Sequence, residues 1–98
     1  MGRLVVAPLA ARDLADIFTY LAQQAGAAVA AKFLRQLEDK LHGIAASGTT
    51  GSARDDLQPG LRLIVFKHRC IYFAVAGDEC RIKRVVHERR NRANLKFD

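Results

Sequence analysis

Cysteine is scarce in this 98-residue sequence, which holds only Cys70 and Cys80, too few for a disulfide framework. We expect the two on opposite arms of one hairpin, roughly 15 Å or more apart at about 3.3 Å per residue, and therefore as free thiols. Free thiols favour a reducing, cytoplasmic setting. Apolar runs stay far below the roughly 20 residues of a membrane span. Since Ala7-Pro8 soon follows the short apolar run Leu4–Val6, we also expect no secretory signal.

Motifs for several common chemistries are also missing. The three histidines, His42, His68 and His87, fall on different predicted elements, with no cysteine or carboxylate at metal-ligand spacing. No glycine-rich loop ends in Gly-Lys-Ser/Thr, and no Gly-x-Ser-x-Gly elbow is present. A cysteine nucleophile is disfavoured, because both cysteines sit within apolar strand patterns. We therefore expect no metal, no cofactor and no catalytic residue.

The positive charge is distributed unevenly along the chain. The net charge is +6, yet residues 1–60 hold six basic and six acidic side chains. Residues 61–98 hold ten basic and four acidic side chains, so they carry the whole excess. Such an imbalance indicates that a polyanion or an acidic partner meets this end of the molecule.

The first half of the chain predicts a short strand and a helical hairpin within one domain, residues 1–98. The apolar run 4–7 is a strand that Pro8 ends. Apolar residues at helical spacing predict helices over 9–24 and 28–46, joined by about three residues around Gly26. The apolar stripes of both helices require one shared apolar surface, which the second half must supply.

The second half predicts a loop, an antiparallel meander and a basic tail. Residues 47–60 are loop-like in composition, and strand-like runs follow at 61–66, 70–76 and 80–87. In the last run, simple alternation places Ile82, Arg84 and Val86 on one face, and Arg84 there must lie at a margin or be paired. Residues 88–98 are the tail. The expected fold is α+β, β-α-α-β-β-β, an antiparallel sheet with the helical hairpin on one face.

A basic cluster at the end of the sheet is the best candidate for function: Lys83, Arg84, His87, Arg89 and Arg90. It is compatible with phosphodiester chemistry, in which basic groups hold the phosphate and a histidine moves the proton. It is equally compatible with a docking surface for an acidic protein or a DNA-bound complex. A solvated edge strand would also carry such residues, because they prevent edge-to-edge aggregation.

Four stretches of the chain, in their order and spacing, match the motifs of one known family. They are Ala7–Ile17 (APLAARDLADI), Gly51–Arg62 (GSARDDLQPGLR), Ile71–Phe73 (IYF) and Arg84–Asn91 (RVVHERRN). On these residues nearly the whole chain resembles the ParE branch of the RelE/ParE superfamily, the toxins of bacterial type II toxin–antitoxin systems. Three positions depart from the pattern, because Tyr72-Phe73 replaces F-Y and Asn91 stands where the family often has Asp.

The resemblance implies the fold inferred above, a cytoplasmic toxin that inhibits DNA gyrase by binding rather than catalysis, and no membrane partner. It also implies a ParD-like antitoxin that holds the toxin inactive in a hetero-oligomer. The residues expected to meet gyrase, with or without its DNA, are Arg81, Lys83, Arg84, His87, Arg89 and Arg90. The residues expected to meet the antitoxin are Arg54, Arg62, Phe66, Tyr72 and Phe73.

Two other functions remain open at this point. The RelE branch cuts mRNA on the ribosome, and His87 with Arg84 and Arg89 keeps such an activity possible, because histidine serves as acid or base near neutral pH. The absence of a tyrosine from the tail favours the gyrase-directed function instead. The third interpretation is a basic binding module that has lost toxicity.

Overall fold

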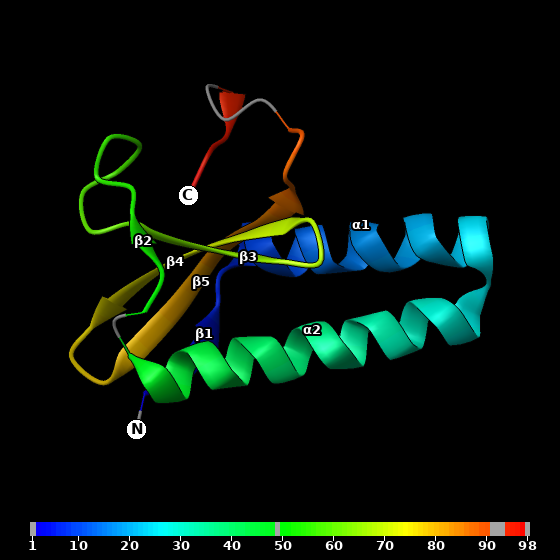
Figure 1. Ribbon diagram of the computed structural model, residues 1–98, viewed down its shortest axis with the longest axis horizontal. Helices are drawn as coiled ribbons and strands as arrows, with labels where there is room; N and C mark the ends of the chain where they lie inside the picture. Colours follow the sequence, from blue (N-terminus) through cyan, green and yellow to red (C-terminus); the bar gives the residue numbers. More distant parts are fainter. Residues whose placement is uncertain (1, 49, 91–93, 98) are drawn as a thin grey trace.

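The computed structural model describes residues 2–48, 50–90 and 94–97. Its elements in chain order are β1 (Arg3–Val6), α1 (Pro8–Ala25), α2 (Ala27–Ser47), β2 (Ser52–Ala53), β3 (Arg62–Phe66), β4 (Arg69–Ala76) and β5 (Glu79–His87) (Figure 1). The strands form one sheet in the order β1-β5-β4-β3-β2. The predicted α+β fold is confirmed, with the short β2 added. Because β1 pairs in parallel with β5, the sheet is mixed rather than wholly antiparallel.

The two helices form a hairpin that is joined more tightly than the sequence predicts. Pro8 occupies the first turn of α1, where its missing N–H costs no hydrogen bond. Only Gly26 separates the helices, and its φ of 97° lies in a region that side chains disfavour. The expected connection of about three residues is therefore a single glycine, and each helix extends to it.

The meander contains two tight hairpins. Lys67 and His68 both have positive φ, 47° and 66°, as a two-residue turn with the right-handed twist of a hairpin requires. Arg69 therefore pairs with Phe66 and opens β4, one residue before the predicted start at Cys70. At the other end of β4, Ala76 pairs with Glu79 across a second two-residue turn.

A bulge in β5 changes which residues share a face. Between the pairs Phe73–Ile82 and Tyr72–Arg84 the register shifts by one residue, and Lys83 is the extra one. Ile82 and Val85 consequently lie in the core on the helix side of the sheet, whereas Val86 lies in the core on the opposite side. The prediction that Ile82 and Val86 share one face was wrong, because simple alternation does not anticipate an inserted residue.

The sheet has two unequal cores. On the face that the helices cover, called here the helix face, α1 and α2 pack Ile17, Leu37 and Leu41 against buried residues of β4 and β5. The opposite face, the second face, has a smaller core of Leu61, Cys70, Tyr72 and Val86. Leu63 of β3 extends this core, and its cover consists of Leu57 from the loop before β3 and of Leu95 and Phe97 from residues 94–97, called here the returning tail. The two cysteines are buried and free, one on each face.

The loop before the meander is held close to β3. Ser52 and Ala53 pair with Leu63 and Arg62 as β2, in a stretch where the sequence predicted only loop. Gly51 allows this approach, because its φ is 83° and a Cβ there would lie 2.6 Å from the carbonyl oxygen of Leu63. None of the helices among the described residues is long and apolar enough to cross a membrane.

Candidate functional site

The end of β5 continues into an ordered basic turn, residues 87–90. The backbone N–H of Glu88 donates to the carbonyl of His68 at 2.9 Å, and that of Arg90 donates to the carbonyl of His87 at 3.0 Å. His87 and the two arginines, Arg89 and Arg90, are exposed. Three of the five residues of the predicted cluster therefore lie in a folded turn and present nitrogen-rich side chains to solvent.

His87 in the basic turn has both a ring and a backbone partner. Its Nδ1 accepts a hydrogen bond from the Arg89 N–H at 3.1 Å, which leaves the proton of the neutral ring on Nε2. Its ring stacks on that of His68, with centroids 6.4 Å apart and 13° between the planes. His68 in turn contacts the carboxylate of Glu88, and this hydrogen bond lowers the pKa of Glu88 below its usual value of 4.5.

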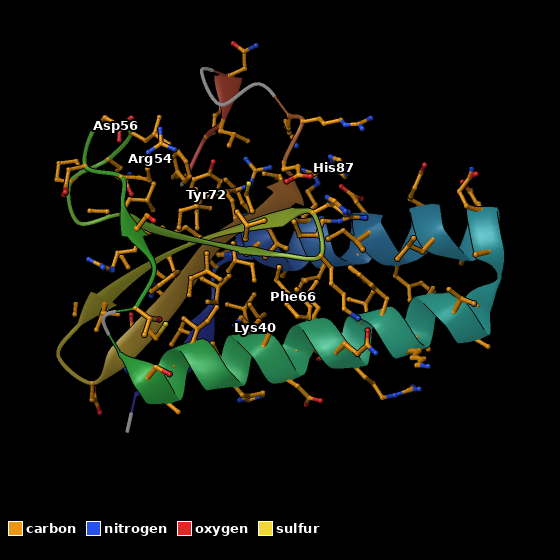
Figure 2. The ribbon with its side chains drawn as sticks, in the orientation of Figure 1. Lys40, Arg54, Asp56, Phe66, Tyr72 and His87 are labelled. Atoms are coloured by element: carbon orange, nitrogen blue, oxygen red, sulfur yellow. The ribbon has the colours of Figure 1, made fainter. Side chains whose placement is uncertain are left out.

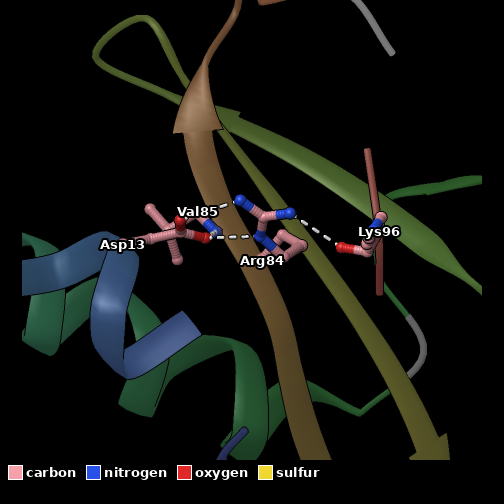
Figure 3. Close-up of polar contacts among 4 residues, drawn as sticks. All are labelled: Asp13, Arg84, Val85 and Lys96. Atoms are coloured by element: carbon pink, nitrogen blue, oxygen red, sulfur yellow. Dashed lines mark hydrogen bonds and ion pairs between the residues drawn. The ribbon is translucent and has the colours of Figure 1, made fainter. Parts of the chain in front are cut away.

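Arg84, also predicted to meet the target, is inside the molecule. Its side chain is 7% exposed and donates from Nε and an Nη atom to the two Asp13 oxygens, at 2.7 and 2.9 Å (Figure 3). The other Nη atom donates to the Lys96 carbonyl at 2.7 Å, and Asp13 also accepts the Val85 N–H at 2.9 Å. The Asp13 hydrogen bonds raise the pKa of Arg84, so it remains charged. Of the two outcomes that the sequence left open for this residue, pairing is the one observed.

Arg81 and Lys83 occupy a third place, nearer the start of β5. With Pro8, Leu9 and Phe97 they line a small cavity of about 120 Å³. Arg81 is half-exposed and donates to Glu79 at 3.3 Å. Arg81 lies six positions before His87, which corresponds to about 20 Å along the strand. The six residues predicted to meet the target thus fall into an exposed turn, a buried ion pair and a separate strand segment.

The residues predicted to meet the antitoxin also divide by exposure. Tyr72 and Phe73 are fully buried, one on each face of β4, so neither presents a surface to a partner in this structure. Arg54 forms a bidentate ion pair with Asp56, at 2.9 and 2.8 Å, at the tip of the loop (Figure 2). Arg62 donates to the backbone carbonyls of Thr50 and Gly51, at 2.7 and 2.8 Å, and thereby holds the loop against β3.

Phe66, also predicted to meet the antitoxin, lies close to two lysine side chains. It is partly buried against the helix face, and Figure 2 shows it directed toward α2 beside Lys40. The ammonium groups of Lys40 and Lys67 lie 6.0 and 5.6 Å from its ring centroid. Lys67 also donates to the side chain of Gln36 on α2. This corner therefore combines an aromatic ring with two positive charges, a suitable contact for an acidic segment.

Sequence reasoning missed a groove between α1 and the basic turn. Its volume is about 480 Å³, and its lining includes Tyr20, Arg69, His87 and Arg90. Tyr20 is exposed, while the Arg69 guanidinium lies 5.4 Å from the Phe33 ring, and burial lowers the pKa of Arg69. Sequence offered a partial indication for Arg69, because it directly precedes the predicted strand 70–76 in the basic part of the chain. Tyr20 lies within the predicted helix 9–24, and nothing in the helical pattern marks it for a function.

Asp13 is the other residue whose role the sequence did not predict. In the sequence, Asp13 lies near the start of the helix predicted over 9–24, where the helix dipole favours a negative charge. The structure shows a buried partner for Arg84, 71 residues further along the chain. The family's motif at the start of this helix contains an aspartate at the same place, and that was the available signal. The described residues contain no cluster of His, Cys, Asp and Glu suited to a metal ion.

Comparisons with known proteins agree with the fold. A family model described as the ParE toxin of the type II toxin–antitoxin system, parDE, matches residues 4–92. Toxin ParE3 of Caulobacter vibrioides is 30% identical over 93 residues, which cover 95% of this chain and 93% of the relative. A solved structure of the chromosomal ParDE system from P. aeruginosa superposes with a TM-score of 0.77 at 24% identity, over 89% of this chain and 96% of that one. The chain therefore belongs to the ParE toxin family of type II toxin–antitoxin systems.

Proposed function

We propose that this ParE-type toxin acts in the cytoplasm by binding DNA gyrase, catalyses nothing itself, and is held inactive by a ParD-like antitoxin. The observation that carries the proposal is the exposed basic turn, in which Arg89 and Arg90 stand beside His87 at the end of the sheet. The two guanidinium groups are presented by a turn that is hydrogen-bonded to the sheet, which suits recognition of an acidic protein or of a protein bound to DNA.

The ribonuclease alternative relies on Arg84, His87 and Arg89, and the contacts of these residues favour binding over RNA cleavage. Arg84 uses Nε and both Nη atoms on Asp13 and on the Lys96 carbonyl, so its guanidinium does not face a substrate. Nδ1 of His87 is occupied by the Arg89 N–H. Such a reaction requires an arginine that holds the phosphate and a freely available base. Arg89 is exposed and remains available to a phosphate, but Arg84 is committed to internal contacts and the Nδ1 atom of His87 is occupied.

The antitoxin is proposed to be an acidic, amphipathic segment that complements the positive second half of the chain. The corner formed by Phe66, Lys40 and Lys67 offers an apolar ring between two ammonium groups. Arg62 opens β3, the strand that Phe66 ends, and Arg54 lies in the loop before it, so these residues follow one strand near the β2 edge of the sheet. A segment that folds as it binds would suit a labile inhibitor of this kind.

The test is a supercoiling assay with purified gyrase and the purified chain, run beside primer extension on translated mRNA. The proposal predicts inhibition of supercoiling or trapped cleaved DNA, its reversal by antitoxin, and no new RNA ends. Full supercoiling at excess toxin, with new RNA ends that depend on the ribosome, would instead establish the endonuclease. Harmless overexpression without antitoxin would support the binding module without toxicity.

A further inference from the structure

The returning tail is a packed part of the domain. Leu95 and Phe97 lie against the second-face core, and the Phe97 ring meets the Tyr72 ring edge-on, with centroids 5.2 Å apart and 73° between the planes. Between these two side chains, the Lys96 carbonyl accepts the hydrogen bond from Arg84. The segment therefore has an apolar anchor and a polar one on the same stretch of backbone.

The basic turn is also fixed on its other side. Glu88 donates its N–H to the His68 carbonyl in the β3–β4 turn, and this contact joins the chain just after β5 to the sheet. Arg89 and Arg90 thus stand in the sequence between two anchored stretches, the end of β5 and the returning tail. Neither arginine belongs to an arm that leaves the domain freely.

One side chain connects these anchors to the scaffold. Arg84 donates two hydrogen bonds to the Asp13 carboxylate of α1 and a third to the Lys96 carbonyl of the returning tail. Only a guanidinium has a planar fork that can serve both partners together, since a lysine ammonium at the same position is a single point charge on a flexible stem. Asp13 also holds the N–H of Val85, so the same carboxylate fixes the strand from which the basic turn emerges.

We propose that Arg84 is a positioning residue: it never touches the target, and its bonds to Asp13 and Lys96 hold the returning tail so that Arg89 and Arg90 are presented in one arrangement. This inference rests on the proposed function, because it explains how the binding surface of the toxin is organised. It differs from the expectation drawn from sequence, in which Arg84 itself met the target.

Two variants separate positioning from contact. Arg84→Lys keeps the positive charge beside Asp13 but removes the donor to the Lys96 carbonyl. Phe97→Ala leaves Arg84 and Asp13 untouched and removes the apolar anchor of the returning tail. Arg35→Lys, at an exposed position on α2, is the matched control for an arginine-to-lysine change. Thermal unfolding of each variant shows whether the domain remains folded.

The first measurement is limited trypsin digestion followed by mass spectrometry, which requires no knowledge of the target. Cleavage after Arg89 and Arg90 is expected to be roughly tenfold faster in Arg84→Lys and in Phe97→Ala than in the parent, because release of the tail exposes these bonds. Arg35→Lys should digest like the parent. Unchanged cleavage in both variants would overturn the proposal, since the two contacts would then not hold the turn.

The second measurement is growth arrest after induction without antitoxin, together with gyrase inhibition in vitro. Both tail-releasing variants should lose at least about tenfold in potency, whereas Arg35→Lys should not. Loss of potency in Arg84→Lys alone, with Phe97→Ala fully active despite a released tail, would overturn positioning and indicate direct contact. If growth arrest is lost when the tail is released but even the parent never inhibits gyrase, the proposed target is wrong and the positioning role stands.

Discussion

The two faces of the sheet are built in different ways. The helix face is covered by two long helices whose apolar stripes, which include Leu37, meet buried strand residues such as Ile71 and Phe73. The second face is covered by the loop before β3 and by the returning tail, which contribute Leu57 and Phe97. Segments without regular hydrogen-bonded structure detach at lower free energy than packed helices. The helix face is therefore the scaffold, and the second face is the part whose cover can be released while the fold persists.

The largest loss of stability is expected at the buried ion pair of Asp13 and Arg84, which connects α1 on the helix face to the returning tail on the second face. Asp13→Ala leaves the Arg84 charge buried without its carboxylate and the Val85 N–H without its acceptor. Breaking one side of a buried ion pair costs about 4 kcal/mol of unfolding free energy. Urea denaturation measures the loss, with Asp16→Ala as the control, since Asp16 is exposed on the same helix. Equal stability of the two variants would show that the pair contributes little.

A matched pair of leucine truncations compares the faces directly. Leu37→Ala removes a fully buried side chain from the helix-face core and is expected to lower the unfolding free energy by about 3 kcal/mol. Such a loss should reduce gyrase inhibition and antitoxin binding together, because the whole domain unfolds more readily. Denaturation curves that detect secondary structure provide the measurement.

Leu57→Ala is the corresponding change on the second face. Leu57 is only partly buried in the cover of that core, so we expect a loss of about 1 kcal/mol. Hydrogen exchange should accelerate in the loop and around Tyr72, while amides of α1 and α2 keep their protection. A loss as large as that of Leu37→Ala, spread over both helices, would contradict the difference between the faces.

The smallest effect concerns Glu88 in the basic turn. Its pKa is lowered in the folded state by the hydrogen bond with His68, so the contact stabilises the fold above the ordinary pKa of 4.5 and is lost as the pH falls through the lowered pKa. Because Glu88 is exposed, Glu88→Gln should lower Tm by about 1 °C at neutral pH. The difference from the parent should vanish in strong acid. A difference that grows on acidification would contradict the assigned sign.

Much of the fold could be predicted from sequence because its signals are local. Helical spacing of apolar residues, Pro8 and the run of β-branched residues in the meander each act over a few positions. The features that sequence missed depend on distant partners. Lys83 gives no sign of a bulge in the sequence, and Asp13 and Arg84 are 71 positions apart in the chain, so only the folded structure brings them together. The sequence pattern therefore could not predict which candidate residues are exposed, and Tyr72, Phe73 and Arg84 are buried in the structure.

The central claim is that the helices form the scaffold and the basic turn binds the target. Two charge-matched double variants in the supercoiling assay test this claim most directly. Arg89→Gln/Arg90→Gln and Lys32→Gln/Arg35→Gln each lower the net charge of +6 by two, the first in the basic turn and the second on α2. The account predicts at least about a tenfold loss of inhibition for the first and less than about twofold for the second. Equal potency of the two, with both chains folded, would contradict it.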